Sequence, residues 1–154
     1  LSFDKIDTDI FKDYSLFQGD NSLGNMFIFY RVYKELSGRS NPLNFASLEH
    51  VLPQKISNDW PNFVDLSDEE KNESIFSLGN FVVTHKDDNS LFSNKSFKEK
   101  KSEYINNIHD PLNNYSDLKC VKIDDDKWTK ELIEKRRDKL IKLFEGDCIP
   151  ATDV

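Results

Sequence analysis

The chain has 154 residues, of which 37% are hydrophobic and 32% charged, a balance typical of one soluble globular domain and not of a disordered chain. Twelve Phe, five Tyr and two Trp supply enough bulky apolar surface for a core, and no apolar run approaches the roughly 20 residues that span a bilayer. The formal net charge of −7 argues against a free-standing nucleic-acid binder, because phosphate binding is driven mainly by Lys and Arg.

The start of the chain and its cysteines indicate its setting. The chain begins with Leu1 and has no signal-peptide pattern, so we expect a piece of a longer cytoplasmic protein. Cys120 and Cys148 belong to no CxxC pair, which excludes a four-cysteine zinc scaffold and suits a reducing compartment. A single disulfide between them stays an alternative.

The first predicted element is a helix over residues 24–37, where apolar and aromatic residues recur at the spacing of a buried helix face. Gly38 ends it. A short apolar run over residues 45–52 then predicts a strand, which Pro53 terminates because proline cannot continue a strand ladder. In the irregular segment that follows, we expect Trp60 to hold the loop against the core.

Helix signals dominate the second half of the chain. A capping box at its start predicts a short helix over residues 67–78, and an apolar run predicts a strand over residues 80–84. Another capping box opens a helix over residues 96–108, and three aspartates precede a last helix over residues 127–144. Two strands followed by a helix, with helices on both sides, predict an α+β fold.

Glu49 and His50 stand next to each other near the end of the first predicted strand. Adjacent side chains of an ideal strand point to opposite faces, but the strand exit at Pro53 can bring both to one edge. A carboxylate beside an imidazole would place a metal ligand next to a proton acceptor. The alternative is a pair that is structural or merely exposed.

Asparagines mark the second strand and the loop after it. Asn80 begins the strand, and Asn89 and Asn94 follow it. Their amide oxygens suit Mg²⁺ or Mn²⁺. Asn80 could instead hydrogen-bond the loop or the imidazole ring, while Asn89 and Asn94 also suit plain turns, because asparagine tolerates left-handed backbone.

Together these segments resemble the HNH, or His-Me finger, endonucleases. The closest likeness is to the C-terminal nuclease domain of GmrSD-type modification-dependent restriction and phage-defence proteins. The residues that carry it are Glu49-His50-Val51-Leu52-Pro53-Gln54, Gly79-Asn80-Phe81-Val82-Val83, and Asn89, Ser93, Asn94, Phe97 and Lys100. The likeness extends to the helix at 24–37, to Trp60, and to Trp128, Ile133, Arg136 and Leu140. Three features depart from the family pattern. Glu49 stands where many relatives carry Asp, no His stands at Asn89 or Ser93, and the cysteine pairs that stiffen several relatives are absent.

The resemblance implies a ββα-metal (His-Me finger) core over residues 44–108 of a single nuclease domain. A helical lead-in (1–43) and a C-terminal helix and tail (109–154) would flank this core. By this likeness His50 would deprotonate the attacking water, and Asn80 would steady the site around it.

One divalent cation, Mg²⁺ or Mn²⁺, is the cofactor that the resemblance implies. Glu49 and Asn89 would hold it, with Asn94 or Ser93 as a further ligand. The residues themselves add a basic patch of Lys95, Lys98, Lys100 and Lys101, opposed only by Glu99. Of these, Lys95, Lys98 and Lys101 could bind flanking phosphates, because Lys98 and Lys101 share one helix face. Arg136 and Arg137 read as a solvated face or an interdomain contact.

The resemblance therefore implies a metal-dependent DNA endonuclease from a bacterial or archaeal cytoplasm, acting in restriction or antiviral defence. Its substrate would be DNA, it would have no membrane partner, and an N-terminal NTPase or sensor domain would choose the target. Two other functions fit the same residues. One is a catalytically inactive nuclease-like module that binds a protein partner or DNA, and the other is an RNA-directed nuclease with the same site.

Overall fold

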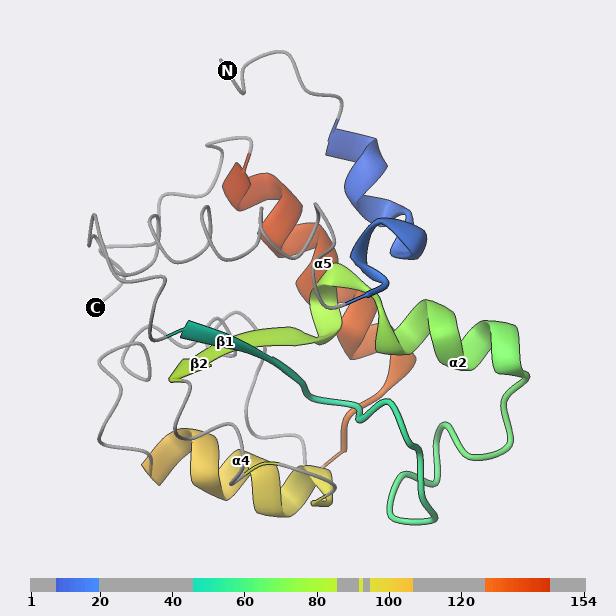
Figure 1. Cartoon of the computed structure of the whole chain (residues 1–154), viewed down its shortest axis with the longest axis vertical. Coiled ribbons are helices and arrows are strands. Elements are labelled where there is room, and N and C mark those ends of the chain that lie inside the picture. Colours follow the sequence, from blue (N-terminus) through green and yellow to red (C-terminus); the bar gives the residue numbers. More distant parts are fainter. Residues whose placement is uncertain (1–7, 20–45, 86–91, 93–94, 107–126, 145–154) are drawn as a thin grey trace.

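A computed structural model describes residues 8–19, 46–85, 92, 95–106 and 127–144 of the chain (Figure 1). Several predicted features lie outside these residues: the helix at 24–37, both cysteines, and the candidate ligands Asn89, Ser93 and Asn94. None of the helices in the described parts combines the length and apolarity needed to cross a membrane.

Two strands form the centre of the described structure. β1 (Ala46–His50) pairs antiparallel with β2 (Phe81–His85), and the register runs from Ala46 opposite His85 to His50 opposite Phe81. The segment that carries the histidine and the segment that follows Asn80 therefore lie side by side, as Figure 1 shows. The strands provide one edge at which the residues around His50 can be held.

β1 ends earlier than predicted and β2 begins one residue later, and Asn80 explains both differences. β1 ends at His50, because beyond it the Val51 N–H bonds the backbone oxygen of Asn80 (2.9 Å) and Leu52 bonds the Asn80 side chain. Asn80 itself is the last residue of η5 (Leu78–Asn80), a 3₁₀ turn, and not the first residue of the strand.

The predicted capping box at Ser67 is confirmed. Its hydroxyl accepts a hydrogen bond from Glu70 N–H (3.2 Å), and the Glu70 carboxylate accepts one from Ser67 N–H (3.1 Å). The helix it opens, α2 (Asp68–Ile75), ends earlier than predicted. Ser77 starts the next element instead, because its side chain accepts a hydrogen bond from Gly79 N–H and caps η5.

The second predicted capping box is confirmed as well. Ser96 and Glu99 exchange the same pair of bonds at the start of α4 (Phe97–Asn106). The last helix, α5 (Lys130–Phe144), begins later than predicted, because the Thr129 hydroxyl accepts the hydrogen bond of Leu132 N–H (3.2 Å).

Two short 3₁₀ turns, η2 (Thr8–Lys12) and η3 (Tyr14–Phe17), precede the strands. Two apolar clusters hold these elements together. The larger consists of Val51, Leu52, Trp60, Phe63, Ile75, Val82, Phe92, Phe97, Trp128 and Ile133, and the smaller of Phe11, Phe17, Leu78, Phe81, Leu140 and Ile141. Trp60 is 2% exposed and belongs to the larger cluster, which confirms that this loop is held on the core.

Between the two clusters, the backbone of η5 lies directly on α5 (Figure 1). A Cβ atom placed on Gly79 would overlap the carbonyl oxygen of Ile133, so only glycine allows this approach. Helices with a small two-stranded sheet make up the described structure, which is the α+β fold that the sequence predicted.

Candidate functional site

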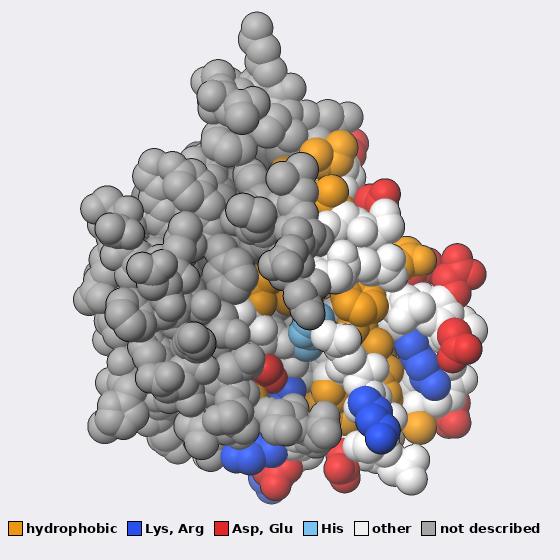
Figure 2. Space-filling view, in the orientation of Figure 1, with side chains coloured by type: hydrophobic (Ala, Val, Ile, Leu, Met, Phe, Trp, Pro, Cys, Tyr) orange, Lys and Arg blue, Asp and Glu red, His pale blue; other side chains and the backbone are white. Residues whose placement is uncertain are grey.

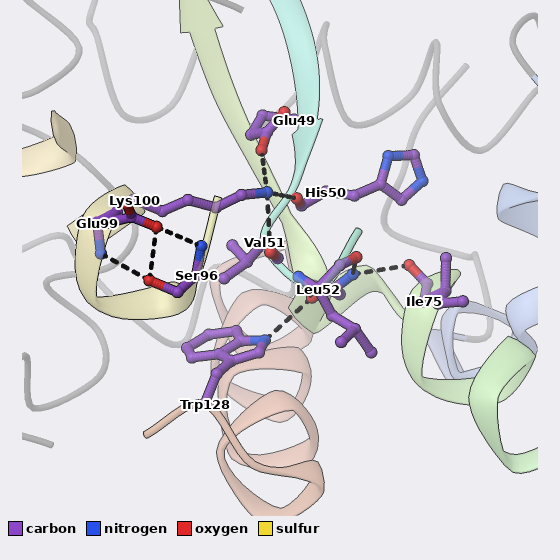
Figure 3. A network of polar contacts seen from close by, with 10 residues as sticks. Glu49, His50, Val51, Leu52, Ile75, Ser96, Glu99, Lys100 and Trp128 are labelled. Carbon is purple, nitrogen blue, oxygen red and sulfur yellow. Dashed lines mark hydrogen bonds and ion pairs between the residues drawn. The ribbon is translucent and has the colours of Figure 1, made fainter. Parts of the chain in front are cut away.

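Glu49 lies at the C-terminal end of β1 and is buried, with 7% of its surface exposed. Its Oε1 accepts a hydrogen bond from the ammonium of Lys100, which comes from α4, at 2.6 Å. The same ammonium donates to the backbone oxygens of His50 (2.9 Å) and Val51 (3.0 Å), as Figure 3 shows. Lys100 therefore joins α4 to the end of β1.

The Lys100 side chain is fully buried, and its ammonium also lies 5.9 Å from the centre of the Trp60 ring. Burial lowers the pKa of Lys100 below its ordinary value of 10.5, because it penalises the charged form. The nearby Glu49 carboxylate opposes this effect by attraction and by its hydrogen bond. The buried charge is thus tolerated because three oxygens surround it.

His50 is half-buried, and its imidazole extends away from Glu49 and Lys100 (Figure 3). The ring lies 4.6 Å from that of Phe81, its neighbour across the two strands, and meets Phe76 edge-on at 5.8 Å. Its Nε2 atom is buried. Strand alternation thus persists as far as His50, and the Glu49 and His50 side chains leave β1 in different directions.

Asn80 is fully buried, and its amide uses all four of its hydrogen-bonding positions. The oxygen accepts from Leu52 N–H (2.8 Å) and from the indole N–H of Trp128 (3.0 Å). The nitrogen donates to the backbone oxygens of Leu52 (3.0 Å) and Ile75 (2.9 Å). Of the two possibilities open from the sequence, the side chain binds the loop and not the imidazole ring.

The predicted phosphate-binding lysines lie on and beside α4. Lys98 is exposed on the helix, and Lys95 and Lys101 are half-buried. Figure 2 shows that basic and acidic side chains both gather over this part of the surface. One acidic side chain, Glu99, bonds Ser96, and this hydroxyl and the Ser96 N–H lower the pKa of the carboxyl.

A divalent cation is the cofactor that the motifs imply, and the donor chemistry at Glu49 fits it in type. Carboxylate oxygen is a ligand that Mg²⁺ and Mn²⁺ prefer. In this structure Oε1 already accepts the hydrogen bond of the Lys100 ammonium, so a cation would have to share or displace this contact. In the described parts of the chain no group of three or more His, Cys, Asp or Glu side chains gathers. Further oxygen donors are therefore needed, and Asn89 and Asn94 stay the predicted ones.

Arg136 was wrongly expected to lie on a solvated face. It is fully buried, and its guanidinium donates a hydrogen bond to the backbone oxygen of Gly79 at 2.6 Å. The spacing of Ile133, Arg136 and Leu140 is the signal that could have placed it, because the other two belong to the buried face of α5. Lys100 was wrongly expected in the basic patch, because it is fully buried against Glu49. Its position three residues after the buried Phe97, on the same face of α4, was the comparable signal.

A cleft of about 180 Å³ lies elsewhere on the molecule, between η3, α2 and α5. Its walls include Tyr14, Ser74, Lys130 and Arg137. None of the predicted site residues that the structure describes lines it.

The sequence was compared with protein families, curated proteins and solved structures. Residues 5–143 match the family described as the C-terminal domain of GmrSD restriction endonucleases. The searches of curated proteins and of solved structures find no match. The matched segment contains both strands, Lys100 and nearly all of α5. It confirms the likeness seen in the motifs. The chain therefore belongs to the family of GmrSD C-terminal domains.

Proposed function

We propose that the chain is the effector domain of a restriction or phage-defence protein and hydrolyses phosphodiester bonds of DNA with one divalent cation, Mg²⁺ or Mn²⁺. The observation that supports this most is the match of residues 5–143 to a restriction endonuclease family, in a chain whose motif residues Glu49 and His50 end β1 beside β2. In this proposal residues 44–108 contain a ββα-metal core.

His50 is the general base in this proposal. A neutral imidazole can take a proton from water near neutral pH, which no other unperturbed side chain does as well. Phe76 and Phe81 pack against the ring, and Lys100 fixes the backbone oxygen of the same residue. These contacts limit the movement of the base, and Asn80 fixes the chain at Leu52, shortly after it.

Glu49, Asn89 and Asn94 would hold the cation. When bound, it would stabilise the negative charge that develops on the phosphate. Glu49 supports this assignment through its chemistry, because it is a buried carboxylate and carboxylate oxygen is a ligand that these cations prefer. Asn89 and Asn94 are proposed from the motif alone.

Lys95, Lys98 and Lys101 would bind phosphates that flank the cut. The net charge of −7 makes these few lysines a weak electrostatic attraction by themselves. We therefore propose that target choice belongs to an N-terminal NTPase or sensor domain of a longer protein in a bacterial or archaeal cytoplasm.

The test is cleavage of supercoiled plasmid and of RNA, each in Mg²⁺, Mn²⁺ and EDTA. We expect DNA to be cut only with a cation, and His50→Ala to lower the rate by about 10²–10⁴-fold, the usual contribution of a general base. Glu49→Gln should raise the cation concentration that is needed. Lys135→Met, at an exposed position of α5, serves as the control.

Other outcomes point to the alternatives. Cutting of RNA and not of DNA would make the chain an RNA-directed nuclease. Biological activity that survives His50→Ala, with no cation-dependent cutting of either substrate, would make it a nuclease-like module that only binds. Circular dichroism of each variant distinguishes a lost function from a lost fold.

A further inference from the structure

We propose that Lys100 is a positioning residue that acts as the resident counter-ion of Glu49 and competes with the divalent cation for its carboxylate. The inference rests on the proposed function, because it takes Glu49 as a ligand of that cation. It gives a role to Lys100, which belongs to the motif but has no role there.

The contacts of the ammonium carry the argument. Lysine has three N–H donors, and all three are used here, by the Glu49 carboxylate and by the backbone oxygens of His50 and Val51. The three acceptors belong to consecutive residues at the end of β1, so one cation fixes both the carboxylate and the path of the chain. Figure 3 shows the ammonium at the meeting point of these oxygens.

Burial makes this arrangement costly to disturb. Lys100 is fully buried and Glu49 is 7% exposed, so neither charge is well solvated. Removing one partner of a buried pair leaves the other charge uncompensated, which destabilises a fold strongly. Without Lys100, the Glu49 carboxylate and two carbonyl oxygens would have to find another cation.

The same proximity sets the relation to a divalent cation. A metal ion bound to Glu49 would lie close to the Lys100 charge, and like charges repel strongly where water is excluded. Binding of the metal must therefore overcome this repulsion or displace the ammonium. A protein without the ammonium should bind the metal more tightly, and should gain more stability from it.

The main experiment compares Lys100→Met with the wild type by thermal unfolding, in EDTA and in Mn²⁺. In EDTA we expect the variant to melt lower by on the order of 10 °C. In Mn²⁺ we expect much of this loss to be recovered, so that the Mn²⁺-induced rise in Tm is larger in the variant than in the wild type. Titration calorimetry should give about tenfold tighter Mn²⁺ binding by the variant, from the repulsion removed.

Two controls accompany it. Glu49→Gln combined with Lys100→Met removes both charges, and should melt higher in EDTA than Lys100→Met alone while losing the response to Mn²⁺. Lys135→Met removes one exposed positive charge from α5, and should respond to Mn²⁺ as the wild type does. A purely structural Lys100 would lower Tm equally with and without Mn²⁺, which overturns the inference.

A measurement on the wild type serves if Lys100→Met does not fold in either buffer. The lysine ¹³Cε signal that Lys100→Arg identifies should shift as Mg²⁺ is added, and an unchanged signal at saturation overturns the inference. Failure of this inference is distinct from failure of the proposed function. In the first case the wild type still cuts DNA with Mn²⁺ while the Lys100 responses are absent; in the second the wild type does not cut.

Discussion

The side-chain oxygen of Asn80 accepts a hydrogen bond from the indole N–H of Trp128 at 3.0 Å, and both residues are buried. The same oxygen accepts a second bond from Leu52 N–H. One amide thus joins the segment after β1, the turn before β2 and Trp128, two residues before α5.

Asn80→Ala should lower the free energy of unfolding by about 3–5 kcal/mol, because it leaves several buried backbone and indole groups without a partner. Urea denaturation measures the loss. Asn72→Ala, at an exposed position of α2, is the matched control and should stay within about 0.5 kcal/mol of the wild type. An equally small loss of stability for Asn80→Ala would show that the hydrogen bonds of the Asn80 amide do not hold these segments together.

Trp128→Phe should lower the free energy of unfolding by less, about 1–2 kcal/mol, because it removes one donor to Asn80. The new ring can still stack on Phe97, whose ring centre lies 5.3 Å from that of Trp128 in the wild type. The Asn80 oxygen would still accept from Leu52 N–H. Combined with Asn80→Ala, the change should add less than it does alone, since the bond is already gone. Full additivity in urea denaturation would show that the two side chains act independently.

Gly79→Ala should destabilise the fold by about 3 kcal/mol or more, because the new methyl group would overlap the backbone of Ile133 and force η5 away from α5. Gly19→Ala separates this steric effect from backbone conformation. Gly19 has a φ of 93° and nothing within 4 Å of an added Cβ, so its cost should be only about 1–2 kcal/mol. Thermal unfolding of both variants decides, and equal costs would refute the close approach of η5 to α5.

The Glu70 carboxyl links stability to pH. Hydrogen bonds from the Ser67 backbone and hydroxyl lower its pKa below the ordinary value of 4.5. The ionised form therefore favours the folded state; its contribution is complete above the unfolded pKa and is lost as the pH falls through the lower folded pKa. Ser67→Ala should raise the Glu70 pKa, as NMR titration of the side-chain carbon would report. Ser96→Ala is the control and should move Glu99 instead; a shift of Glu70 in both variants would contradict the assignment.

Replacing Lys98 and Lys101 by Gln should weaken DNA binding across all sequences, if these lysines bind phosphates as proposed. Each lost contact should reduce the slope of log affinity against log salt by roughly 0.9. Fluorescence anisotropy at several salt concentrations measures this slope. Lys135→Gln changes the net charge by the same amount per residue, and an equal effect there would show that only the total charge matters.

Local signals predicted the three α-helices of the second half of the chain well and their boundaries less well. The capping boxes at Ser67 and Ser96 involve neighbouring residues only, so the sequence places them correctly. The predicted end of β1 was wrong because the N–H groups of Val51 and Leu52 bond Asn80, which lies far along the chain, and do not continue the strand pairing. Such non-local bonds leave no mark in a local pattern.

The candidate site divides in the same way. The motif predicted that the segment with His50 and the segment after Asn80 come together, and they do. It did not predict that Lys100 and Arg136 are buried, because a charged residue is buried only where distant oxygens receive it, as at Glu49 and Gly79. The catalytic and metal-binding assignments of the other residues stay predictions from the motif.

The contact of Trp128 with Asn80 bears on how small a working version of this domain can be. A shortened chain that stops before Trp128 would keep both strands and every motif residue up to Lys100, yet it would lose the indole donor and the Arg136 guanidinium. It would also lack α5, the helix against which η5, the turn before β2, packs. The shortest chain that keeps this fold must therefore include Trp128 and Arg136, although both lie well beyond the residues around His50 and Asn80.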